Sequence, residues 1–326
     1  MKQKKKNIKH KKNNNFLSNI LIVLVALLVF FQLNISSNAE SLKFVQFSDS
    51  HISDRERNSS YKYLTLSKDI LKDAVMQVNL MPNVDFVMHT GDGVDTPKES
   101  LIDVFIDEMN KLNVPWYMTF GNHDISIDGD VTKKFYLSKL QNGNTSFTFD
   151  KPYYSFEPKK GFKVIGLDTI ITGKITANGE IYEEEKNWLK KEIEQTPDNT
   201  FIMIFSHVPI KEPFSSPHHK LNNEAEMQEL LKSFNRPLAV FNGHYHTTKI
   251  QRDGNIVYVS SPALVGFPYA FRVVNVTNGR KNIVIKLDYK KSGLEKLKQE
   301  GSGELVGVSL YLGGDKDRNT VIELEK

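Results

Sequence analysis

Residues 84–95 read VDFVMHTGDGVD, in which an apolar run rich in β-branched and aromatic residues leads into a cluster of glycine and aspartate. The run 84–88 is typical of a buried strand, and the cluster Gly91-Asp92-Gly93-Val94-Asp95 is typical of the loop that follows a strand. The same arrangement occurs four more times. The other runs are 43–47, 115–120, 201–205 and 237–241, and their clusters are Asp49-Ser50-His51, Gly121-Asn122-His123-Asp124, Ser206-His207 and Gly243-His244-Tyr245-His246.

Helical patterns lie between these runs. Apolar residues recur at spacings of three and four over 63–78 and over 101–112, which predicts amphipathic helices. Strands that alternate with helices are joined by crossovers, so the pattern indicates an α/β protein with a largely parallel sheet. In such sheets, ligands bind outside the carboxyl ends of the strands. We therefore expect the five polar clusters to converge on one side of the molecule.

In their order along the chain, the clusters resemble the motif series DxH, GDxxD, GNH(D/E), H and GHxH of the calcineurin-like metallophosphoesterases. All five elements are present between Asp49 and His246. The resemblance implies a four-layer α/β/β/α sandwich, in which helices flank two mixed sheets. It also implies a binuclear-metal hydrolase that cleaves a phosphate monoester or diester by attack of a metal-bound hydroxide.

The resemblance implies a role for each motif residue. His123 resembles the residue that meets the phosphate and the leaving group. Asp95 and Asp124 are expected to orient histidines, because ligating imidazoles donate their second N–H to an acceptor, although Asp124 could instead close the turn after its strand. The implied ligands are Asp49, His51 and His246 for the first metal, Asp92 for both metals, and Asn122, His207 and His244 for the second.

Purple acid phosphatases place an iron-binding tyrosine a few residues after the bridging aspartate, where this chain has Gly93-Val94-Asp95. The chain therefore departs from the ferric-tyrosinate pattern while keeping the rest of the series. Its donors are carboxylate, amide oxygen and imidazole, and it has no cysteine. Such donors suit manganese, iron, zinc or nickel, and we expect two divalent ions, with manganese, iron or zinc first. Two ions about 3.5 to 4 Å apart can share a hydroxide as nucleophile and clamp phosphate oxygens.

The amino-terminal residues have a different composition from the rest. Residues 2–12 contain seven lysines and no acid, residues 20–31 are all apolar, and Ser37-Asn38-Ala39 resembles a cleavage site. This layout is typical of a secretory signal, and residues 16–33 are just long enough for a membrane anchor. In either case the lysines stay in the cytoplasm, so we expect an extracytoplasmic protein that is secreted or anchored to the membrane.

Without that segment the charge balance reverses. The chain has 43 lysines and arginines and 39 acids, and seven of the lysines precede Glu40, which leaves 36 basic against 39 acidic residues. Nothing therefore indicates a nucleic-acid groove. Two other functions stay open: a cell-surface binding module with structural metals, and an anchored structural protein. Against them, every ligand is present, and no repeat or low-complexity segment implies a protein partner.

The carboxyl-terminal region contains further strand patterns. Residues 249–252 with 256–260, and 271–276 with 283–287, read as hairpins that complete a second sheet packed on the first. A short charged helix over 293–299 and strands over 305–312 and 320–324 are expected beyond them. We expect three parts: a leader at 1–39, a phosphoesterase domain at 40–290 and a strand-bearing extension at 291–326. Specificity is expected from the loops 171–180 and 211–221, although His218 and His219 in the second loop also fit inert surface positions.

Overall fold

The computed structural model describes residues 39–59, 61–299 and 308–326. The chain divides into two units, Met1–Glu40 and Ser41–Lys326, and apart from Glu40 at the start of its first strand the architecture below lies in the second. The predicted leader or anchor at 1–39 falls outside the described residues, apart from Ala39. Among the helices that are described, none combines the length and the apolar character needed to cross a bilayer.

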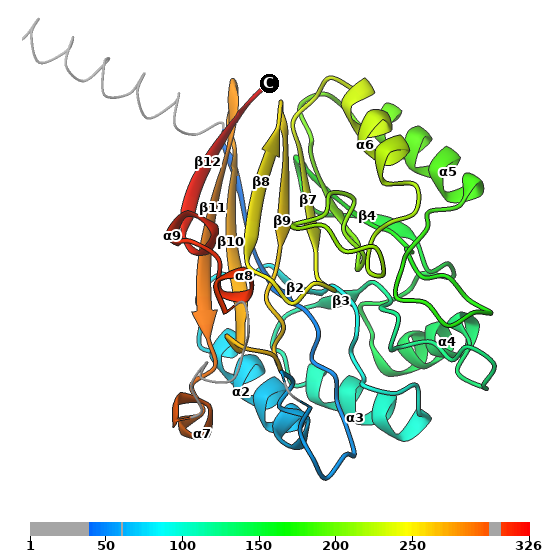
Figure 1. The fold of residues 1–326 in the computed structure, drawn as a ribbon. Coiled ribbons are helices and arrows are strands. Elements are labelled where there is room, and N and C mark those ends of the chain that lie inside the picture. The colour runs from blue at the N-terminus through cyan, green and yellow to red at the C-terminus, as the bar shows by residue number, and fades with distance from the viewer. Residues whose placement is uncertain (1–38, 60, 300–307) are drawn as a thin grey trace, which may run out of the picture. The chain divides into compact units, whose positions relative to one another are not determined.

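Two six-stranded sheets form the centre of the fold (Figure 1). The first has the order β12-β11-β10-β1-β2-β3 and the second the order β4-β5-β6-β7-β9-β8. The first comprises β1 (Glu40–Phe47), β2 (Phe86–His89), β3 (Trp116–Met118), β10 (Ala270–Asn278), β11 (Asn282–Lys291) and β12 (Thr320–Glu325). The second comprises β4 (Tyr154–Lys159), β5 (Phe162–Gly166), β6 (Phe201–Phe205), β7 (Leu238–Asn242), β8 (Lys249–Asp253) and β9 (Ile256–Ser260).

Both sheets are mixed. In the first sheet, β1, β2 and β3 pair in parallel, whereas β10, β11 and β12 pair antiparallel. In the second, β5, β6, β7 and β9 pair in parallel, and β4 and β8 are antiparallel edge strands. The predicted α/β class with two mixed sheets is therefore confirmed.

Helices cover the outer faces of the sheets. Phe105 of α3 packs edge-on against Trp116 of β3, with ring centroids 5.8 Å apart, and Glu192 of α5 accepts a hydrogen bond from Ser155 of β4 at 2.7 Å. The longer helices are α2 (Ser67–Asn79), α3 (Glu99–Met109), α4 (Lys133–Gly143), α5 (Glu183–Glu194) and α6 (Glu224–Ser233). The short ones are η1 (Leu64–Leu66), α7 (Glu295–Gln299), α8 (Val308–Leu312) and α9 (Asp315–Arg318).

Aromatic rings from both sheets pack together in the core. Phe44 of β1 stacks on Phe86 of β2 at 5.2 Å and meets Phe205 of β6 and Phe241 of β7 edge-on at 5.5 and 5.2 Å. Burial of each ring removes a large apolar area from water, and each aromatic pair in a preferred geometry stabilises the fold by about 0.5 to 1.5 kcal/mol more. The two sheets are therefore held face to face at the strands that lead into the polar clusters.

The strands divide between the sheets differently from the sequence-based expectation. The expectation that the two hairpins together complete a second sheet is wrong, because β10 and β11 join the sheet of β1, and β8 and β9 join the sheet of β7. Each sheet thus combines parallel strands that bear motifs with one of the two expected hairpins. The reason is that the aromatic core places β6 and β7 opposite β1 and β2 rather than beside them.

The carboxyl-terminal region also differs in part. The charged helix is present as α7, and the predicted strand at 320–324 is β12, which pairs with β11. The predicted strand over 305–312 is wrong where that stretch is described, since Val308–Leu312 forms α8. Short apolar runs do not distinguish strand from buried helix by pattern alone.

Candidate metal centre

The five polar clusters meet at one place. Asp49 and His51 follow β1, Asp92 follows β2, Asn122 and His123 follow β3, His207 follows β6, and His244 and His246 follow β7. The loops after β1 and β2 are joined by backbone hydrogen bonds. The Asp49 N–H donates to the Gly91 carbonyl and the His51 N–H donates to the Asp92 carbonyl, both at 3.0 Å. The structure thus brings together every residue that the sequence implied as a ligand.

The backbone turns sharply at these positions. Asp49, Asp92 and His244 have φ values of 52°, 55° and 69°, and His51 and His246 are also in the left-handed region. L-residues rarely adopt this conformation, and it costs of the order of 1 to 3 kcal/mol each where it persists. In a regular strand, the two-residue spacing would place Asp49 and His51 on one face. Both residues lie in the turn after β1, and this turn directs their side chains toward the other polar clusters.

Two glycines leave room for the carboxylates. A Cβ on Gly121 would collide with the Asp92 carboxylate, and a Cβ on Gly243 would collide with the Ser48 hydroxyl and lie 2.6 Å from Asp49 Oδ2. Glycine is therefore required at both positions, because the backbone there lies directly against a buried aspartate.

Asp49, His51 and His246, here called the first trio, are buried side chains whose donor atoms face one another. His246 Nε2 lies 3.2 Å from Asp49 Oδ1 and 3.4 Å from His51 Nε2. Ligands bound at about 2.0 to 2.2 Å from one ion lie about 3 to 3.5 Å from each other. Two imidazole nitrogens pointing at each other are poorly satisfied without a cation between them, so this donor set fits a metal.

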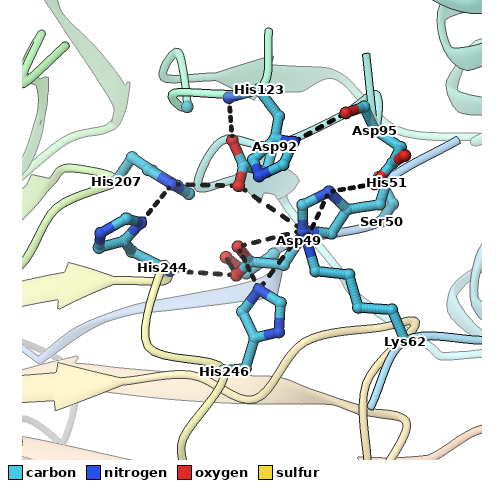
Figure 2. Close-up of polar contacts among 12 residues, drawn as sticks. Asp49, Ser50, His51, Lys62, Asp92, Asp95, His123, His207, His244 and His246 are labelled. Carbon is cyan, nitrogen blue, oxygen red and sulfur yellow. Dashed lines mark hydrogen bonds and ion pairs between the residues drawn. The ribbon is translucent and has the colours of Figure 1, made fainter. Parts of the chain in front are cut away.

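Asp92, His207 and His244, the second trio, repeat this arrangement (Figure 2). His207 Nε2 lies 3.1 Å from His244 Nδ1, 3.4 Å from Asp92 Oδ2 and 3.2 Å from the Asn122 amide oxygen. Asp92 Oδ2 is also 3.6 Å from His51 Nε2. One oxygen of Asp92 is therefore within reach of donors from both trios, which is the position of a bridging ligand.

A third set of donors, His51, Asp95 and His123, is also close together. Here protein partners already satisfy the groups, because Arg55 Nε lies 2.7 Å from Asp95 Oδ2 and His123 Nδ1 lies 2.7 Å from the Asp95 carbonyl. We therefore assign only the first and second trios, with Asn122, as candidate metal positions.

Charges within the site are strongly coupled. Burial by itself would raise the pKa of Asp92, but the neighbouring His207, His123 and His51 outweigh it and hold the pKa well below its usual value. Burial likewise opposes the charged form of His207, yet the Asp92 carboxylate raises the pKa of His207 to about 9. Without metal, a proton on His207 thus compensates the Asp92 charge.

Two other imidazoles of the site, those of His51 and His244, are held in the neutral form. Burial is the largest cause that lowers the pKa of His51 and of His244 well below 6.5, and nearby cationic groups add to it. Neutral imidazole is the form that binds metal ions. Asp49 and Asp92 are therefore ionised and His51 and His244 are neutral, whereas His207 carries a proton that a metal would displace.

The carboxylates of Asp95 and Asp124, which were expected to orient histidines, make different contacts. Asp95 Oδ1 lies 3.7 Å from His51 Nδ1, opposite the nitrogen that faces the first trio. Asp124 instead accepts backbone N–H groups from Asp92, Gly121 and Val94 at 2.9, 2.8 and 3.2 Å. Its hydrogen bonds correspond to the alternative expectation, that it closes the turn after its strand. His207 Nδ1 has a partner that the motifs did not indicate, the Thr90 carbonyl at 2.8 Å.

A cavity of about 290 Å³ opens beside the two trios. Besides Asp92, Asn122, His123, His244 and His246, it is lined by Tyr61, Lys62, Ala177, Phe214, Ser216, His219, Tyr245 and Tyr311. Both loops expected to set specificity contribute, the first through Ala177 and the second through His219, whose ring lies 5.5 Å from that of His244. Tyr61 and Lys62 carried no signal in the sequence, because single residues in loops have no periodicity, and Tyr311 lies in the short helix α8, where a strand was expected.

Lys62 is the buried cation of this cavity. Its ammonium lies 3.4 Å from His51 Nδ1, and only 6% of the residue is exposed (Figure 2). Backbone bonds fix the segment, since Lys62 pairs with Gly266 and the Tyr63 N–H donates to the Val265 carbonyl at 2.7 Å. Lys62 therefore lies beside His51 in the wall of the cavity, on a segment that backbone contacts hold to residues 265 and 266.

Comparison with known proteins identifies similar chains. The family model described as calcineurin-like phosphoesterase matches residues 42–248. A probable glycerophosphodiester phosphodiesterase of Arcobacter nitrofigilis is 28% identical over 207 residues, which are 62% of this chain and 71% of that protein. Tartrate-resistant acid phosphatase type 5 of Rattus norvegicus is 25% identical over 225 residues, 59% of this chain and 64% of that one. A dimetal phosphatase from Danio rerio has the same fold, with a TM-score of 0.61 at 18% identity over 76% of this chain and 95% of that chain.

Proposed function

The chain belongs to the calcineurin-like phosphoesterase family and is a metal-dependent phosphoesterase, and on that premise we propose that it hydrolyses a phosphate monoester or diester at the two trios. One observation carries the proposal. Asp92 Oδ2 lies 3.6 Å from His51 Nε2 and 3.4 Å from His207 Nε2, between donors that would otherwise form two separate sites.

The side chains divide into three roles. The first trio would hold one divalent ion, while His207, His244 and Asn122 would hold the other, with Asp92 contacting both. Oxygen and nitrogen donors without thiolate favour manganese, iron or zinc. Two such ions, when bound, activate a water molecule and offset the negative charge of a phosphate. Lys62, facing the same cavity, would attract the anionic substrate.

His123 lies where it can act on the leaving group. Its backbone N–H donates to Asp92 Oδ1 at 2.8 Å, and its Nδ1 lies 2.7 Å from the Asp95 carbonyl, an acceptor that requires a proton on Nδ1. Its Nε2 is then the nitrogen left to exchange a proton in the cavity that His123 lines. We propose that His123, when it carries a proton on each ring nitrogen, contacts a phosphate oxygen through Nε2–H and passes that proton to the departing alkoxide, which leaves a neutral imidazole with its proton on Nδ1.

The location of the protein is a proposal that rests on the sequence. The lysines of 2–12 followed by the apolar residues 20–31 support export, either with cleavage after Ala39 or with 16–33 as an anchor. The catalytic domain would then be 40–290, extended by 291–326. Cell fractionation of the full chain tests this, and an uncleaved protein in the cytoplasmic fraction contradicts it.

The activity is tested with the purified full chain, stripped of metal and reloaded with manganese, iron or zinc separately. We expect two ions per chain by elemental analysis and release of nitrophenol from p-nitrophenyl phosphate, bis(p-nitrophenyl) phosphate or both. Two bound ions with no turnover of any ester would instead favour a binding module whose metals serve structure. A chain that binds no ion contradicts both functions.

A further inference from the structure

The cavity has two aromatic walls, one beside each trio. Next to the first trio, the Tyr61 ring lies 5.8 Å from that of His246, and Tyr311 lines the same crevice. Next to the second trio, the His219 ring lies 5.5 Å from that of His244, and Phe214 packs edge-on against Tyr245 at 5.0 Å. His246 belongs to the first trio and His244 to the second, so each trio has one aromatic wall next to it.

Tyr311 comes from a part of the chain beyond the matched residues 42–248. Its carbonyl accepts the Thr248 N–H at 3.0 Å, and the carbonyl of Leu310 accepts the Thr247 hydroxyl. Farther along, Asp317 Oδ1 accepts the Ile250 N–H at 2.9 Å. Figure 1 shows α8 and α9, in red, beside the strands of both sheets. The wall at Tyr311 is thus attached to the backbone that directly follows His246.

A phosphate centred on the two trios would direct its organic groups toward these walls. A monoester has one such group and needs one wall, whereas a diester has two. Among the residues that the structure describes, Lys62 is also the only lysine or arginine that lines the cavity. Lys62 would thus add one positive charge to the charge that the two ions supply to the bound phosphate.

We propose that the preferred substrates are phosphodiesters with an apolar or aromatic group on each side of phosphorus, and that Tyr311 is a specificity-determining residue that contacts one of these groups. The proposal rests on the proposed phosphoesterase function. Tyr311 would act through contact with the ester group and not on the reacting atoms. Its loss is therefore expected to affect diesters selectively and to act mainly on KM.

The test compares two substrates that share one leaving group, bis(p-nitrophenyl) phosphate and p-nitrophenyl phosphate, in the manganese-loaded full chain. In Tyr311→Ala we expect kcat/KM for the diester to fall about three- to tenfold, chiefly through KM, and that for the monoester to change less than about twofold. Tyr311→Phe, which keeps the ring, is expected to retain diester activity. Tyr182, a tyrosine that is 50% exposed and does not line the cavity, provides the matched control Tyr182→Ala.

Equal losses for both substrates in Tyr311→Ala, or no loss for the diester, would overturn the proposal. Thermal unfolding of each variant separates a folding defect from lost contact. If Tyr311→Ala does not fold, Tyr61→Ala removes the other tyrosine of the same wall and is expected to show the same selectivity for the diester.

Binding separates this proposal from the proposed function. Titration calorimetry with diphenyl phosphate and phenyl phosphate needs no turnover. If the unmodified chain hydrolyses no ester, the proposed function fails. Even then, if Tyr311→Ala binds diphenyl phosphate more weakly and phenyl phosphate equally well, the result supports contact between Tyr311 and the diester. Unchanged binding of diphenyl phosphate in Tyr311→Ala overturns the proposed contact with Tyr311, even if the enzyme is active.

Discussion

The two trios and the walls of the cavity beside them are built differently. The trios sit at the ends of strands, and their side chains are buried, as in Asp49 and His51, which are both 0% exposed. The walls come from loops and from the carboxyl-terminal region, and Tyr61 remains 42% exposed. Strand ends hold donor atoms at fixed distances, whereas loops can vary without disturbing them. We infer from this difference that the residues at the strand ends carry the reaction chemistry and that the walls select the substrate.

The most severe test of that division removes the shared carboxylate. In Asp92→Asn the charge that faces both trios is lost, so we expect both ions to bind much more weakly and turnover to fall about 10⁴-fold or more. Elemental analysis after gel filtration measures the ion content. Asp107→Asn changes an exposed acid on α3 and is the control. Full metal content in Asp92→Asn would mean that this carboxylate is not a ligand.

Replacing His123 tests a residue that borders both regions. His123→Ala is expected to keep both ions, because its ring belongs to neither trio, and to lower kcat about 10²- to 10⁴-fold if it protonates the leaving group. An ester with a more acidic leaving alcohol should lose less rate, because it needs less protonation. His218→Ala, an exposed loop residue, is the comparison. Unchanged kcat would remove His123 from the mechanism.

Removing the metal should expose the charge coupling of the second trio. The pKa of His207 in the folded chain is raised to about 9, against the usual 6.5, so the stabilisation from its proton is complete below pH 6.5 and is lost as pH rises through 9. We expect the metal-free chain to lose stability between pH 7 and 9 in urea unfolding, and the loaded chain to lose less. A metal-free His207→Asn chain without this slope supports the assignment, and an unchanged slope contradicts it.

The smallest expected effect is on the wall beside the second trio. His219 Nδ1 lies 2.8 Å from the Ser216 hydroxyl, in a loop outside both trios. His219→Ala should raise KM by less than about tenfold and leave kcat and metal content unchanged, because only substrate contacts are lost. The adjacent His218→Ala serves again as the control. A lower metal content in His219→Ala would show that the walls and the trios are not independent.

Local pattern predicted the strands well and their arrangement poorly. Each motif strand was recognised from its β-branched and aromatic run, and the pairs 249–252 with 256–260 and 271–276 with 283–287 were recognised as hairpins. The hairpin of β4 and β5 was not foreseen, because Pro158 and the lysines around it weaken the strand pattern. Division into two sheets depends on contacts such as that of Phe44 with Phe241, almost two hundred residues apart, which no short window contains.

The site shows the same limit. The candidate donor residues were predicted because strand ends converge and because the motif order is specific, and the structure places these residues close together. The left-handed backbone of Asp49 and His244 was not foreseen. Tyr311 was missed entirely, since its place depends on the packing of α8 against the strand after His246. Packing between segments that are far apart in the chain produces no periodic pattern in the sequence.

The donors come from both sheets, with Asp49, Asp92 and Asn122 after strands of the first and His207 and His244 after strands of the second. An ion bound there joins the two halves of the core, and because it binds the folded chain more tightly than the unfolded one, occupancy and folding are thermodynamically linked. A cell that is short of the metal would therefore hold a chain that opens and is degraded by proteases more readily. Metal supply would set the abundance of the enzyme as well as its rate.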